Sequence, residues 1–406
     1  MGVRIGQPWL ASRNRASLGS LFFARTGPIH PFFTAAGRLK VSLLLNSKAD
    51  KRARSTAGPV STGPRASTRL DLPLLGLLTL LCFVGHLLTG PYALDIASLS
   101  RLLSEPLAAR QSADGLVFWQ LRLPRSLLTA LVGCALAVAG AAMQGLFRNA
   151  LADPSIIGVT SGASLGASLA IALGAASWAG ASWLGLSLIT LGAFGGGLLA
   201  SVLVFGLARR AQGQAVTSML LLGIAVTAMA GAISSGLEYF VDDSMLRRMS
   251  LWRMGGLDGA NWARVNLALL LLLPLSLLLL GKATALNILL LGESEARHLG
   301  IAVNDLQRQL IVWVALLVAT AVALAGVIGF IGLVVPHMLR LLLGADHRRL
   351  LPASCLAGAS LLLLADSVAR ALVSPSEIPT GVITALIGAP VFVWILRRSP
   401  LLQARA

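Results

Sequence analysis

Long apolar runs dominate the chain from residue 71 onward, and glycine, proline and short charge clusters separate them. A helix that spans a bilayer needs about 20 mostly apolar residues. The runs are continuous rather than alternating, and lipid offers no hydrogen bonds to bare peptide groups, so the pattern favours helices over a barrel. The ten predicted spans are residues 72–90, 126–147, 155–176, 183–208, 215–236, 265–281, 309–327, 328–344, 351–373 and 379–397.

The division between the seventh and eighth spans rests on three glycines. Gly326, Gly329 and Gly332 interrupt one long apolar stretch before Pro336. Glycine and proline punctuate regular structure. A short broken helix and a clean turn both fit this pattern.

Two pairs of segments repeat weakly at offsets near 190 residues. Residues 136–146 resemble residues 323–333, and residues 162–167 resemble residues 358–363. Five spans per half would place the halves in opposite orientations, a plan common among transporters. The predicted fold class is therefore an all-α polytopic membrane protein, with about ten transmembrane helices per protomer in two inverted five-helix halves.

Composition agrees with a membrane protein, because 56% of the 406 residues are hydrophobic and only 12% are charged. The formal charge of +17 would suit a nucleic-acid partner, but residues 1–70 hold 12 Lys or Arg and one acid. This leading segment is rich in Ser, Thr, Pro, Gly and Arg, a composition typical of disorder. We predict a disordered tail or an over-long translated start at 1–70, a ten-helix domain at 71–400, and no nucleic-acid partner.

An even number of spans places both termini on one side of the membrane. The positive-inside rule puts the basic tail in the cytoplasm. The prediction is a multi-pass protein of the plasma (inner) membrane with both termini cytoplasmic.

The apolar runs contain few groups that could support chemistry. No GxxxxGK[ST] phosphate loop occurs, so ATP chemistry must come from another chain. Cys82, Cys134 and Cys355 lie within apolar runs without metal-like spacing, so we predict small hydrophobes rather than a disulfide or a zinc site. We predict no catalytic residue, no metal site and no cofactor bound by this chain.

The longest predicted cytoplasmic connection contains LGESEARHLGI at residues 291–301. Glu293 and Glu295 suit the start of a helix, Glu293 and Arg297 can pair at i,i+4, and Gly300 can end the helix in a left-handed conformation. A short cytoplasmic helix fits this pattern, and an interfacial turn is the alternative.

Several long segments together resemble the permease family of iron-siderophore, haem and cobalamin ABC importers. They are residues 122–167, beginning RLPRSLLTALVGCALAVAGAAMQGL, and 291–300, LGESEARHLG, followed by 329–352, GFIGLVVPHMLRLLLGADHRRLLP, and 363–398, beginning LLADSVARALVSPSEIPTGV. The resemblance covers about residues 70–398. It implies a homodimer or a pair of similar permeases, a separate ATP-hydrolysing subunit, and a periplasmic or lipid-anchored substrate-binding protein.

The resemblance also implies roles for particular residues. Within a coupling segment at 284–305 that docks on the ATPase, Gly292, Glu293, Ala296, Arg297 and Gly300 match the motif. Arg122, Arg125 and Arg370 match arginines that receive acidic residues of the binding protein. From the residues alone, arginines at a membrane edge are more often snorkelling anchors.

Three further expectations concern polar residues near the ends of spans. Thr217 and Ser218 match positions near a cytoplasmic gate, although a helix cap explains them as well. Asp153 is predicted to cap a turn, and Asp366 to accept hydrogen bonds within the protein.

The predicted function is the permease subunit of an ATP-driven, binding-protein-dependent importer, with ferric siderophores as the first cargo. Haem and cobalamin are alternatives within the same class. An ion-coupled secondary transporter is a more distant alternative, because Asp366, His86 and His337 are the main ionisable groups at membrane depth and such carriers usually need more.

Overall fold

The computed structural model describes residues 71–92, 94, 100–102, 104, 112–174, 187–208, 215–373 and 376–398. The chain divides into two units, Met1–Ala66 and Ser67–Ala406. The predicted tail at 1–70 lies outside the described residues, so it stays a prediction.

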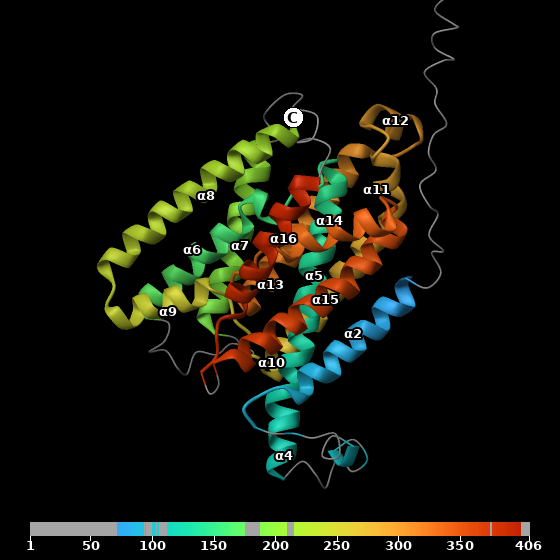
Figure 1. The fold of residues 1–406 in the computed structure, drawn as a ribbon. Coiled ribbons are helices and arrows are strands. Elements are labelled where there is room, and N and C mark those ends of the chain that lie inside the picture. The colour runs from blue at the N-terminus through green and yellow to red at the C-terminus, as the bar shows by residue number, and fades with distance from the viewer. Residues whose placement is uncertain are drawn as a thin grey trace, which may run out of the picture. The chain divides into compact units, whose positions relative to one another are not determined.

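Each of the ten predicted spans corresponds to a helix (Figure 1). Among the described residues, six helices are long and apolar enough to cross a membrane, and four more are shorter apolar helices. The predicted polytopic α-helical fold is therefore confirmed. The ten helices are α2 (Asp71–Leu88), α5 (Leu123–Leu146), α6 (Val159–Ala172), α7 (Leu188–Ala208), α8 (Ala215–Phe240), α10 (Trp262–Leu280), α13 (Val303–Ala325), α14 (Ile331–Leu343), α15 (His347–Leu372) and α16 (Thr380–Arg398).

Shorter helical segments lie between these ten. The segment before α5 is helical from residue 113, so α5 continues a longer helix. The short segments are α4 (Ala113–Leu116), the π-helix η2 (Val117–Arg122), the 3-10 helix η3 (Pro154–Ile157), α9 (Asp243–Arg253), α11 (Ala283–Leu289) and α12 (Glu293–His298).

Helices α5 and α13 form the centre of the bundle. An apolar stretch of 18 residues within Ala113–Leu146, the long helix that ends with α5, is 78% buried. The corresponding stretch of α13 is 72% buried, and that of α8 is 22% buried. Figure 1 shows α5 between α13, α14 and α15, with α8 at the outside. Large apolar side chains such as Leu221 and Ile224 on α8 are exposed. Lipid or another membrane protein can cover such a face.

Glycines allow the central helices to approach closely. A Cβ atom on Gly140 of α5 would overlap the carbonyl oxygen of Gly332 of α14, and one on Gly133 would overlap that of Gly358 of α15. Close approach is the main source of packing energy between helices in lipid. The small residues of α5 therefore hold it at the centre of the bundle.

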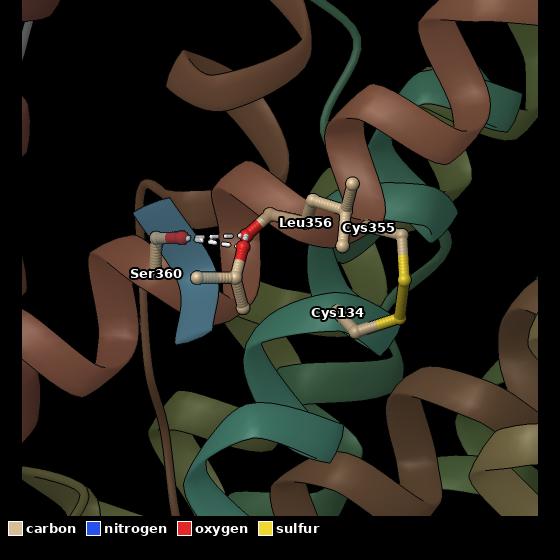
Figure 2. The surroundings of a disulfide bond; sticks show 5 residues. Cys134, Cys355, Leu356 and Ser360 are labelled. Carbon is tan, nitrogen blue, oxygen red and sulfur yellow. Dashed lines mark hydrogen bonds between the residues drawn. A yellow bond between two sulfur atoms is a disulfide. The ribbon is translucent and has the colours of Figure 1, made fainter. Parts of the chain in front are cut away.

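The prediction for two of the three cysteines is wrong. Cys134 of α5 and Cys355 of α15 form a disulfide, with their Cα atoms 4.0 Å apart (Figure 2). The two residues are 221 positions apart in the sequence, so local spacing gave no sign of the pair. They meet because α5 and α15 are in close contact at the neighbouring Gly133 and Gly358. Cys82 is free and buried, as predicted for a small hydrophobe.

A clean break separates the seventh and eighth spans. Helix α13 ends at Ala325, residues 326–330 are not helical, and α14 begins at Ile331. Gly326 and Phe330 both adopt positive φ, at 67° and 68°. The weak repeat of 136–146 at 323–333 does not reflect equivalent local structure, because the first segment is continuous helix and the second contains this break. The inverted relation of the two halves stays a prediction.

Candidate functional site

The predicted coupling segment forms a projecting helical knob at one end of the bundle. Residues 284–305 comprise most of α11, the helix α12 and the start of α13. In Figure 1, α12 lies at the end of the bundle opposite α4. Gly292 precedes α12 at φ 126°, and Gly300 follows it at φ 84°. The short helix with a left-handed end is confirmed.

The contacts of α12 divide it into an anchored face and an exposed face. Ala296 is fully buried, and Gln307 of α13 donates a 3.1 Å hydrogen bond to Glu293. Toward the exposed side, Arg297 Nη2 lies 3.4 Å from the other oxygen of Glu293, Oε2, the predicted i,i+4 pair. The Arg297 side chain is 58% exposed. The knob thus presents a charged surface on a fixed support.

Hydrogen bonds at the start of α12 favour the charged form of Glu295. A hydrogen bond from its own backbone N–H, together with one from the Ser294 hydroxyl, lowers the pKa of the exposed Glu295 below its ordinary value. Negative charge is favourable at a helix N-terminus.

Helix α11, the first part of the knob, is hydrogen-bonded to the first turn of α15. Asn287 of α11 accepts a 2.8 Å hydrogen bond from the backbone N–H of His347, and it donates one of 2.5 Å to Asp346. Asp346 caps α15 by accepting from the Arg348 N–H at 3.0 Å. Partial burial favours a higher pKa for Asp346, but these two hydrogen bonds lower it below its ordinary value. These hydrogen bonds tie α11 to the N-terminal end of α15.

Three arginines and Asp366 form a second cluster, here called the arginine cluster, near the ends of α2, α5 and α15. Arg122 donates to the carbonyl oxygens of Leu87 at 2.6 Å and Leu88 at 2.9 Å, and also to that of Tyr92. Arg370 donates to the carbonyl oxygens of Thr89 at 2.8 Å and His86 at 3.0 Å. The final carbonyls of a helix lack partners within the helix, and cations stabilise that end. Arg122 and Arg370 therefore hold the C-terminal end of α2.

Burial separates these two arginines from Arg125. Arg122 is 5% exposed and Arg370 is 4% exposed, whereas the side chain of Arg125 is 12% exposed. All three were predicted to dock a binding protein, and the described conformation commits the donors of Arg122 and Arg370 to α2. Their docking role stays a prediction.

Arg125 holds one carboxylate on each side of its guanidinium group. Its Nε and Nη2 atoms donate to the two oxygens of Asp366, each at 2.9 Å. Its Nη1 atom donates to both oxygens of Glu377, at 2.8 and 3.1 Å. Such bidentate pairs of charged groups are among the strong hydrogen bonds. Glu377 lies in the linker between α15 and α16, and sequence analysis did not identify it.

Asp366 is the buried centre of this network. It accepts hydrogen bonds from Thr380 of α16 at 2.7 Å and contacts His86 Nε2 of α2 at 2.8 Å. The Arg370 Nε atom lies 3.3 Å from the same carboxylate. The predicted role of Asp366 as a hydrogen-bond acceptor within the protein is confirmed, and the residue joins four helices.

The remaining predicted residues lie outside these two clusters. Asp153 accepts a 2.8 Å hydrogen bond from the Ser155 N–H and caps η3, as predicted. Thr217 and Ser218 lie in the first turn of α8, and Ser218 is half-buried. This position fits both a gate role and a cap role for the two residues, so both roles stay predictions. Among the described residues, no group of three or more His, Cys, Asp or Glu could hold a metal ion.

A family model supplies the decisive comparison, because residues 77–398 match the model of the FecCD transport family. The chain belongs to the FecCD transport family. This FecCD-family protein is therefore a multi-pass inner-membrane permease of an ABC importer, and ATP hydrolysis belongs to a separate subunit.

Two curated relatives and one solved structure agree with the family. The hemin transport system permease protein HmuU of Yersinia pestis is 43% identical over 334 residues, which are 82% of this chain and 97% of the relative. The vitamin B12 import system permease protein BtuC of Serratia proteamaculans is 44% identical over 286 residues, 70% of this chain and 83% of the relative. A metal-chelate type ABC transporter solved in an inward-facing conformation has a TM-score of 0.71 and 35% identity, covering 81% of this chain and 99% of that one.

Proposed function

We propose that this permease imports an iron chelate, with haem as the first cargo to test. Support comes from the match to the hemin permease, which extends over 97% of that relative. Ferric siderophores, the first cargo predicted from the sequence, remain the second candidate because the related solved transporter is of metal-chelate type.

The proposed mechanism begins at the knob formed by α12. ATP binding and hydrolysis in the separate subunit would move α12, and Arg297 would form a contact with that subunit. The support is geometric, because the Arg297 side chain is 58% exposed while Ala296 behind it is fully buried. The motion would pass through Asn287 to the start of α15, which also carries Asp366 near its other end. This path joins the two clusters along one helix.

The proposed orientation places α12 in the cytoplasm and the arginine cluster at the external face, where a substrate-binding protein docks. The basic sequence before α2 favours this orientation. We also propose a second permease copy, since the exposed apolar side chains of α8 suit either lipid or a partner. Thr217 and Ser218 at the start of α8 would then lie near the cytoplasmic gate.

The cargo can be tested by uptake in cells that lack this gene and other importers of the same cargoes. Radiolabelled haem, ferric siderophores and cobalamin are supplied separately, with the wild-type gene or an empty vector restored. We expect energy-dependent haem uptake only with the wild-type gene. Rescue of siderophore or cobalamin uptake instead would reassign the cargo, and no rescue of any cargo would contradict the importer function.

A further inference from the structure

Glu377 occupies the outward side of Arg125, the most exposed member of the arginine cluster. The two residues share two hydrogen bonds, at 2.8 and 3.1 Å. The Glu377 side chain is 31% exposed, whereas Asp366 on the inward side of Arg125 is fully buried. The outward half of the guanidinium group therefore has a partner that solvent can reach.

We propose that Glu377 is an exchangeable internal ligand of Arg125, and that a carboxylate side chain of the binding protein takes its place on Nη1. The proposal rests on the proposed function, because it requires a binding protein that docks at this face. It assigns the exchange to Arg125 alone, since the donors of Arg122 and Arg370 hold the carbonyl groups at the end of α2.

The linker geometry allows the exchange without a change of fold. Ile378 donates its backbone N–H to the Ala369 carbonyl oxygen at 3.2 Å, and Thr380 is tied to Asp366 at 2.7 Å. The backbone on the C-terminal side of Glu377 is thus anchored to α15. Rotation of the Glu377 side chain alone would release Nη1, while Asp366 keeps Nε and Nη2 in place.

The charge and the space at this position fit an incoming carboxylate. A cavity of about 390 Å³ has five charged residues in its lining, namely Arg122, Arg125, Arg370, Asp258 and Glu377. The three guanidinium groups there are balanced by three carboxylates, those of Asp258 and Glu377 in the lining and that of Asp366 bound to Arg125. When Glu377 rotates away, the cavity gains an uncompensated positive charge beside an open hydrogen-bond donor. An acidic side chain supplies both the opposite charge and an acceptor oxygen for Nη1, and charge-assisted hydrogen bonds of this kind are strong.

The test measures the dissociation constant between the permease–ATPase complex in lipid nanodiscs and the binding protein encoded with it. Glu377→Gln removes the competing charge, so we expect binding about two- to fivefold tighter, the range of an exposed ion pair. Asp258→Asn is the matched control, because it removes a carboxylate from the same cavity while Arg125 keeps Asp366 and Glu377. We expect that control to change affinity by less than about twofold.

A double-mutant cycle separates exchange at Arg125 from a general charge effect. In an Arg125→Gln background, Glu377→Gln should no longer tighten binding. Thermal unfolding of each variant verifies the fold, and Glu377→Asp, which shortens the side chain, provides a second variant with an expected intermediate affinity.

The possible outcomes distinguish a failure of the exchange at Arg125 from a failure of the proposed docking face. Equal changes for Glu377→Gln and Asp258→Asn, or weaker binding by Glu377→Gln, would overturn the exchange while leaving the importer function intact. Absence of binding by the wild-type complex would overturn the proposed docking face and the exchange with it.

Discussion

Replacement of Asp366 should destabilise the bundle more than replacement of any exposed carboxylate. The side chain is fully buried and pairs with Arg125 at 2.9 Å, Thr380 at 2.7 Å and His86 at 2.8 Å. Asp366→Ala removes the carboxylate that contacts the buried guanidinium of Arg370 and that accepts from Nε and Nη2 of Arg125. Removal of one partner from a buried ion pair costs about 3–5 kcal/mol. Asp366→Asn keeps the shape and loses the charge, so we expect a cost of about 1.5–3 kcal/mol, that of one charged hydrogen bond.

The assay is equilibrium unfolding of the purified protein by SDS in mixed micelles, from which the free energy of unfolding is compared between variants. Asp153→Asn is the matched control, because asparagine caps a helical turn about as well as aspartate and the cost should stay below about 0.5 kcal/mol. If Asp366→Ala unfolds within about 1 kcal/mol of the wild type, the network does not hold α2, α5, α15 and α16 together.

Two further predictions concern the packing of α5. Gly140→Ala should destabilise the protein by about 1–3 kcal/mol, because the new methyl group overlaps the Gly332 carbonyl. Gly85→Ala, where the space is open, should not destabilise it, and equal effects in the same unfolding assay would refute this packing. The disulfide predicts that peptide mapping without reduction recovers a cross-linked pair containing Cys134 and Cys355, and that reduction separates it. Two free thiols in freshly isolated membranes would contradict the bond.

The positions of the spans could be predicted because the bilayer imposes a length and an apolar composition on each segment. The local chemistry of 291–301 likewise predicted α12, since the Glu293–Arg297 pair and the Gly300 end depend on neighbours along the chain. Both predictions use information within a few helical turns.

Contacts between distant segments could not be obtained in this way. Glu377 and Arg125 are 252 positions apart, and Cys134 and Cys355 are 221 apart. Neither pair has a local pattern that specifies its partner. For Arg122, the sequence suggested a docking arginine or a membrane-edge anchor, and nothing near it indicated that the carbonyl groups at the end of α2 would use its donors.

The central claim is that α12 couples this permease to a separate ATPase. We expect Arg297→Ala to change the free energy of unfolding little, because its ion pair with the half-buried Glu293 is open to solvent on the Arg297 side. Arg247→Ala, an exposed arginine on α9 away from α12 in Figure 1, is the control.

The most direct measurement is ATP-driven cargo uptake into proteoliposomes that contain the permease, its ATPase and an excess of binding protein. With equal insertion of all variants, we expect uptake for the wild type and Arg247→Ala, and at least tenfold less uptake for Arg297→Ala, a loss of about 1.4 kcal/mol or more in coupling. If the Arg297→Ala variant takes up cargo and stimulates ATP hydrolysis as well as the wild type does, α12 does not couple the permease to the ATPase through Arg297.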